Sequence, residues 1–136
     1  MTKSTREEAE LGTKIYLHLI GNKHYKNIIN LIRFELPKLK SYEEYKEKYP
    51  DGSDGNYYFN LCGRYMEYLG ALHYDGHIPV GLVLDGMGSV MYSDEVHMIV
   101  EGMRKETDNP VRYENWQYLG NKCREYWEKR KPEPRY

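Results

Sequence analysis

The chain has 136 residues, a formal net charge of −1, 40 % hydrophobic residues and 30 % charged residues. This balance is typical of a globular protein and excludes a disordered chain, while the near-zero charge argues against nucleic acid as a partner. No apolar run approaches the roughly 20 residues of a membrane-spanning helix, and the polar N-terminus lacks the apolar stretch of a secretory signal. We therefore predict a cytoplasmic protein with no membrane partner.

Hydrophobic residues recur along the chain at intervals of three and four, the period of helices packed against a core. A chain of this length can bury one such core. We expect an all-α bundle of five or six helices, with a single helical domain over residues 1–131 and a tail over 132–136. Cys62 and Cys123 have no Cys-x-x-Cys spacing and fall within helical patterns, so we predict buried free thiols.

Two helices are predicted in the first quarter of the chain. Residues 4–7, Ser-Thr-Arg-Glu, have the spacing of a capping box, and the helix that follows runs to about Ile20. Gly21 either breaks this helix or bends it. A second helical stripe continues to Leu36, where Pro37 limits it because the residue before a proline is pushed out of helical geometry. The side chains expected to be buried from the first helix are Leu11, Ile15, Tyr16, Leu19 and Ile20.

The longest helical pattern spans residues 53–76, and we expect the other helices to pack on it. Ser53 or Asp54 would cap its first turn, and Gly76 would supply a left-handed stop. Just before it, residues 41–49 are predicted to form a short polar helix that ends in a turn. The apolar stripe of the long helix consists of Tyr58, Leu61, Cys62, Tyr65, Leu69 and Leu72.

Three segments follow the long helix. Residues 78–84 form a short helix or, alternatively, a strand, although no second strand is predicted to pair with it. From Ser89 to about Glu106 the pattern is helical. Asn109 and Pro110 are then a favourable cap and first residue for the last helix. The side chains expected to be buried from that helix are Tyr113, Trp116, Leu119, Gly120, Cys123 and Trp127.

The C-terminal half combines three features: a long apolar helix that closes at Gly76, a short apolar segment over 78–84, and a closing phrase over 104–106 and 109–119. In this order they resemble an uncharacterised all-helical domain family of prokaryotic genomes, a domain of unknown function. Members of that family have an aromatic residue midway along the penultimate helix, whereas residues 93–97 here contain none. The resemblance covers about half the chain and implies a helical fold but no reaction.

The best candidate for a metal site is formed by His73, His77, Asp94 and His97. Asp94 and His97 are three residues apart on a predicted helix and share a face, and carboxylate with imidazole suits zinc, iron or manganese. Gly76 interrupts the helix between the first two histidines, however, and the Glu-x-x-His pairs of helical di-metal sites are absent. The alternative is that each histidine is satisfied by a carbonyl or a helix end, and we expect no cofactor.

The chain has fifteen tyrosines but only two phenylalanines. Tyrosine joins an apolar ring to a hydroxyl and is enriched at interfaces, although it also suits the margin of a core. Tyr42, Tyr45 and Tyr49 are spaced three and four residues apart, so they either dock onto the bundle or form an exposed aromatic stripe. The tyrosines that fall outside the buried stripes, and are therefore candidates for binding a protein partner, are Tyr42, Tyr45, Tyr49, Tyr57 and Tyr68.

No motif of catalytic quality is present, so functional hypotheses rest on surfaces. The tyrosine excess and the near-neutral charge favour a non-enzymatic protein-binding module, such as an adaptor or inhibitor of viral or mobile-element origin, that binds another protein or a second copy as a homodimer. One alternative is a metal-dependent enzyme that uses the His/Asp cluster. Another is a nucleic-acid-associated protein that binds through the basic segments 22–40 and 119–136, which flank an acidic middle.

Overall fold

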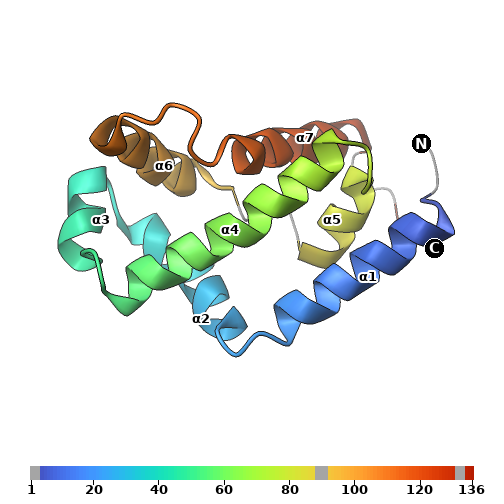
Figure 1. Cartoon of the computed structure of the whole chain (residues 1–136), viewed down its shortest axis with the longest axis horizontal. Helices are drawn as coiled ribbons and strands as arrows, with labels where there is room; N and C mark the ends of the chain where they lie inside the picture. Colours follow the sequence, from blue (N-terminus) through green and yellow to red (C-terminus); the bar gives the residue numbers. More distant parts are fainter. Residues whose placement is uncertain (1–3, 88–91, 131–133) are drawn as a thin grey trace.

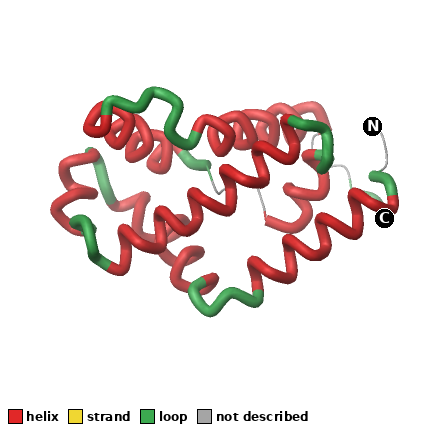
Figure 2. The backbone as a smooth tube through the Cα atoms, viewed as in Figure 1, coloured by secondary structure: helices red, strands yellow, loops and turns green. Residues whose placement is uncertain are grey.

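The computed structural model describes residues 4–87, 92–130 and 134–136, in which helices are joined by turns and no strand occurs (Figure 1 and Figure 2). The all-α prediction is confirmed. These residues form seven α-helices rather than five or six, because both short segments, near residues 45 and 83, fold as helices of their own. They are α1 (Arg6–Ile20), α2 (Tyr25–Asn30), α3 (Tyr42–Lys48), α4 (Asp54–Tyr74), α5 (Val80–Met87), α6 (Asp94–Thr107) and α7 (Glu114–Arg130).

α4 crosses the centre of the molecule diagonally, as expected of the helix on which the others pack (Figure 1). α7 lies along one side of α4, and α2 lies along the other. α3 packs against α6 at one end of the molecule. At the other end, α5 packs against both α7 and α1. None of the helices in the described ranges is both long and apolar enough to cross a membrane.

The two longest helices, α4 and α7, pack closely against each other. Gly70 of α4 lies so near the backbone of Asn115 that a Cβ atom at Gly70 would overlap the Asn115 carbonyl oxygen. Glu67 on α4 accepts hydrogen bonds from Trp116 N at 2.9 Å and from Asn115 Nδ2 at 3.2 Å. The first N–H groups of a helix have no partner within it, and the helix dipole favours a carboxylate beside them. α4 therefore caps the start of α7 and fixes its position.

The buried face of α4 differs from the predicted stripe, with which it shares only Cys62 and Leu69. It is turned toward α7 and the turn before it, where Gly70 lets α7 approach closely and Gly63 leaves room for the Tyr113 ring. A pattern of apolar residues does not identify glycine as a contact residue, so sequence periodicity misses this face. Its buried members are Phe59, Cys62, Gly63, Met66, Leu69 and Gly70. The predicted members that lie at the core margin and are only partly buried are Tyr58, Leu61, Tyr65 and Leu72.

α1 lies at the edge of the bundle. Thr5 caps it, and Glu8 completes a capping box one residue later than predicted. The helix ends before Gly21, so the glycine breaks it rather than bending it. Because only one side of α1 meets the bundle, Leu19 is its single buried residue, and the expectation for Tyr16 and Ile20 is wrong: both are exposed.

The second predicted helix is helical to its end, but its pitch changes along its length. After α2 the chain widens into a π-helical turn over Leu31–Glu35 and then tightens into a 3-10 turn over Leu36–Lys38. Pro37 therefore lies inside the last turn instead of just beyond the helix. Ile28, Leu31, Ile32 and Leu36 remain buried through these changes of pitch.

The segment after the long helix is a helix and not a strand, since α5 begins one residue after Pro79. α6 begins at Asp94, with the Ser93 hydroxyl accepting a hydrogen bond from Val96 N at 3.2 Å. The predicted start of that helix at Ser89 lies outside the described residues.

α7 begins at Glu114, four residues later than predicted. The Asn109 side chain accepts a hydrogen bond from Val111 N at 3.3 Å, which makes a turn in place of a helix cap. Tyr113 has a φ angle of 57°, in the left-handed region that L-residues rarely adopt, so it cannot be part of an α-helix. Residues 109–113 are therefore a turn that leads into α7. Trp127, near the end of α7, is exposed and not buried as expected.

Candidate binding surface

The structure does not bring the four residues proposed as metal ligands together into one group. Among the residues that the structure describes, no three His, Cys, Asp or Glu side chains are grouped closely enough to hold a metal ion. His73 and His97 each have a local hydrogen-bond partner, and His77 is exposed. His73 Nδ1 is hydrogen-bonded to Ile78 O at 2.8 Å, and His97 Nδ1 to Tyr92 OH at 2.8 Å. Asp94 Oδ1 lies 3.9 Å from Arg124 Nη2, in an ion pair.

The predicted tyrosine stripe on α3 docks onto the bundle. Tyr45 is fully buried, so it has no surface to offer a partner, and its hydroxyl donates to Asn56 Oδ1 at 2.8 Å. Tyr42 and Tyr49 are partly buried at the core margin. Their rings lie against Gly102 and Gly55, respectively, where a Cβ atom would overlap the ring. These three tyrosines are therefore part of the packing of the fold, and Tyr45 has no exposed surface for a partner.

Several tyrosine hydroxyls join separate elements, which explains much of the tyrosine excess. Tyr65 OH is hydrogen-bonded to His18 Nδ1 at 2.9 Å and accepts from Asn22 Nδ2 at 3.2 Å, so it ties α4 to the end of α1. Tyr58 OH accepts from Asn27 Nδ2 at 3.2 Å and ties α4 to α2. The ring of each packs at the core margin while the hydroxyl reaches a polar partner, as tyrosine permits.

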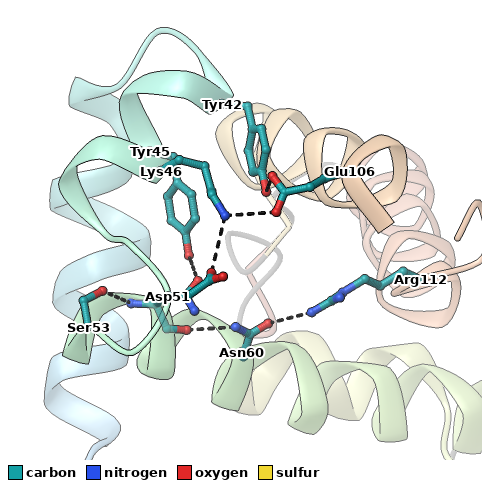
Figure 3. Close-up of polar contacts among 9 residues, drawn as sticks. Tyr42, Tyr45, Lys46, Asp51, Ser53, Asn60, Glu106 and Arg112 are labelled. Carbon is teal, nitrogen blue, oxygen red and sulfur yellow. Dashed lines mark hydrogen bonds and ion pairs between the residues drawn. The ribbon is translucent and has the colours of Figure 1, made fainter. Parts of the chain in front are cut away.

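A network of charged and polar groups fastens α3 to α6 (Figure 3). Glu106 accepts hydrogen bonds from Lys46 Nζ at 2.9 Å and from Tyr42 OH at 3.0 Å, and Lys46 also pairs with Asp51 at 3.4 Å. The hydrogen bond from Lys46 lowers the pKa of the Glu106 carboxyl, and that from Tyr42 lowers it further. Burial, with the hydrogen bond to Glu106, raises the pKa of Tyr42 to about 12.

Asn60 connects α4 to the turn before α7 (Figure 3). Its side-chain oxygen accepts from Tyr113 OH at 2.7 Å and from Arg112 Nη2 at 3.3 Å, while its Nδ2 donates to Asn56 O at 3.0 Å. The Arg112 guanidinium also lies 5.3 Å from the centre of the Tyr113 ring. The partners of Arg112 named here are neutral groups that hold it at the surface beside α4.

A pocket of about 510 Å³ opens between the start of α4 and this turn. We call it the arginine pocket because Arg64 and Arg112 face it from two different segments. Neither guanidinium forms an ion pair with any residue in the described part of the chain. The polar and aromatic residues that line the pocket with the two arginines include Ser53, Asn56, Tyr57, Asn60 and Tyr113.

A second pocket, of about 500 Å³, lies between α4 and the end of α1. We call it the histidine pocket because His18 and His24 line it. Tyr57 lines both pockets, with its ring centre 5.4 Å from that of His24 in an edge-on contact. The histidine pocket is also lined by Leu17, Gly21, Asn22, Lys23 and Leu61.

The outer face of α4 joins the two pockets. Tyr57, Leu61, Arg64 and Tyr68 follow one another at intervals of four, three and four residues, so they lie within about 60° of each other around the helix. Tyr57 is 50 % exposed and Tyr68 is 62 % exposed, and Arg64 is also exposed. These two tyrosines are the exposed members of the predicted partner-binding set, while Tyr42 and Tyr49 are partly buried.

Comparison of the chain with protein-family models, curated proteins and solved structures found no match. The resemblance of the C-terminal half to an uncharacterised helical domain family therefore stays a prediction.

Sequence reasoning missed Arg64 and Arg112 as candidate binding residues. The spacing of Tyr57, Arg64 and Tyr68 is visible in the sequence and places the three side chains on one stripe of the helix. No sequence signal brings Arg112 to this face, because it depends on the turn over 109–113 and on a contact with Asn60, 52 residues away.

Proposed function

We propose that this chain is a non-enzymatic helical module that binds another protein through the outer face of α4. The observation that carries the proposal is the stripe of exposed Tyr57, Arg64 and Tyr68 with the partly buried Leu61, which has a pocket on each side of Tyr57. Tyrosine and arginine are the residue types that dominate binding energy at protein interfaces, and they do so where neighbouring pockets accept partner side chains.

The charge of this face favours a different protein over a second copy of the chain. Arg64, Arg112 and Lys23 line the two pockets, against one acidic residue, Asp54. In a symmetric homodimer the same patch meets itself, so these cations would face one another. Like charges brought together across an interface cost binding free energy. We therefore propose an adaptor or inhibitor whose partner is another protein, and we expect the isolated chain to be monomeric.

The test is affinity capture from extracts of the organism that encodes the chain, with the partner identified by mass spectrometry. Three forms are compared: the natural chain, the double variant Tyr57→Ser with Tyr68→Ser, and the matched control Tyr74→Ser. Tyr74 is 70 % exposed on the same helix but lies about 100° around it from Tyr57.

We expect a discrete partner to be captured by the natural chain and by Tyr74→Ser but lost from the double variant. Circular dichroism should show equal helicity for all three forms, because the substituted side chains are exposed. Capture of the same partner by the double variant would contradict the proposal, as would the absence of any specific partner.

A further inference from the structure

The arginine pocket has the electrostatic character of an anion site. Two arginines from different segments line it, and neither has an ion-pair partner in the described ranges. Asp54 is the single acidic residue of the lining, and it stands in the first turn of α4, where the helix dipole already compensates a negative charge. A concave site with an excess of one sign of charge concentrates the field and attracts the opposite charge.

Arg112 is held in place before any ligand arrives. It donates one hydrogen bond to the Asn60 side chain and lies over the ring of Tyr113. A guanidinium has five N–H donors, so most of its donors remain for a ligand. Arg64 is exposed, one turn after Asn60 on α4, and lines the same pocket as Arg112. Planar donor pairs of this kind match the two oxygens of a carboxylate.

The surroundings favour a peptide. Tyr57 forms a wall of the pocket and leads across the stripe to Leu61 and the histidine pocket, so an anion bound at the arginines has aromatic and apolar surface beside it. A nucleic acid would present a row of phosphates, whereas the lining of this pocket supplies two cationic side chains, Arg64 and Arg112. An acidic side chain followed by apolar residues matches both parts of this face.

We infer that the arginine pocket binds a glutamate or aspartate side chain of an extended acidic segment in the partner protein. This inference rests on the proposed function and specifies its partner. The acidic side chain lies between Arg64 and Arg112, and the apolar residues that follow it cross Tyr57 toward the histidine pocket.

The test uses two short fluorescein-labelled peptides and fluorescence anisotropy at low ionic strength. One peptide carries glutamates interspersed with leucines, and its twin has glutamine in place of every glutamate. The variants are Arg64→Gln, the double variant with Arg112→Gln, and the control Lys129→Gln, which removes one exposed positive charge from the far end of α7. Inorganic phosphate and a single-stranded RNA oligonucleotide are added as competitors.

We expect the glutamate peptide to bind about tenfold more tightly than its twin. The double variant should lose that difference, Arg64→Gln should lose part of it, and Lys129→Gln should keep it. Arg64 makes no hydrogen bond within the part of the chain that the structure describes, so Arg64→Gln remains informative if the double variant unfolds. Phosphate should compete only at millimolar concentrations.

Equal binding of the two peptides would overturn the inference, as would an equal loss with Lys129→Gln. Preferential binding of the RNA over the glutamate peptide would also overturn it, in favour of a phosphate ligand. The two proposals can fail separately: if a partner is captured through Tyr57 and Tyr68 but the arginine variants have no effect, the proposed function holds and the anion site is wrong.

Discussion

The ring of Tyr113 lies against Gly63 of α4 so closely that a Cβ atom at Gly63 would come within 2.5 Å of Tyr113 Cζ. The same ring meets Trp116 edge-on, with ring centres 5.5 Å apart, and its hydroxyl bonds Asn60. Gly63 therefore sets how near the turn over 109–113 comes to α4. Since Arg112 belongs to that turn, this contact between a glycine and a tyrosine also places one side of the arginine pocket.

Replacement of Gly70 by alanine should destabilise the protein. The added Cβ would meet the backbone of Asn115, which cannot rotate away, so α4 and α7 must separate. Overpacking of this kind costs about 1–3 kcal/mol in the free energy of unfolding. The matched control is Gly12→Ala on α1, where the new Cβ would lie 3.3 Å from the mobile end of the Leu82 side chain. Chemical denaturation should show a loss for Gly70→Ala and none for Gly12→Ala; equal stabilities would show that the contact between α4 and α7 is looser than described.

Tyr113→Phe should lower the free energy of unfolding by about 1 kcal/mol, the usual contribution of one hydrogen bond. The substitution removes only the hydroxyl that donates to Asn60 Oδ1 at 2.7 Å. Tyr68→Phe is the control, because Tyr68 is 62 % exposed, and changes at such positions stay within about 0.5 kcal/mol. The comparison is made by urea denaturation, and identical midpoints for the two variants would count against the role assigned to Asn60.

Acid should weaken the attachment of α3 to α6. Hydrogen bonds from Lys46 and Tyr42 hold the pKa of Glu106 below its ordinary value of 4.5. A carboxyl whose pKa is lower in the folded state stabilises the fold above its unfolded-state pKa, and this stabilisation is lost as the pH falls through the folded-state pKa. Below about pH 4.5, stability should therefore fall more steeply for the natural chain than for Glu106→Gln.

The control for this pH dependence is Glu47→Gln, since Glu47 is exposed on the same helix as Lys46. As the pH is lowered, the free energy of unfolding of the Glu47→Gln variant should fall in parallel with that of the natural chain. Parallel curves for the natural chain and Glu106→Gln would contradict the role of Glu106.

Both cysteines should resist modification in the folded protein. Burial raises the pKa of the Cys62 thiol to about 12 and that of Cys123 to about 11, so little thiolate forms at neutral pH. Ellman's reagent should react slowly with the native chain and release two equivalents of product in guanidinium chloride, one for each cysteine. Fast reaction of either thiol without denaturant would show that its side of the core opens readily.

The helices could be predicted because their signals are local. Ser53 caps α4, as expected from its sequence position, and the residues spaced by three and four on α7 from Trp116 to Cys123 are buried. The face of α4 that meets α7 could not be predicted, because Gly63 and Gly70 contribute by lacking a side chain, whereas apolar periodicity counts side chains.

The candidate site was only partly predictable for a similar reason. Tyr57 and Tyr68 could be singled out because they fall outside the apolar stripe of their helix. Tyr45 has the same property within its short segment, yet it is fully buried, since Gly102 allows the neighbouring Tyr42 ring to dock and brings α3 onto α6. Whether a short amphipathic helix docks depends on the surface opposite it, and that surface is set by tertiary packing.

The most direct test of the account is photo-crosslinking at Tyr57. A benzoylphenylalanine is placed at position 57 or, as a control, at position 74, and each form is irradiated in extracts of the organism that encodes the chain. The account predicts a discrete crosslinked product with another protein from position 57 and none from position 74. Absence of a product at position 57, equal products from both positions, or a product consisting of two copies of this chain would contradict it.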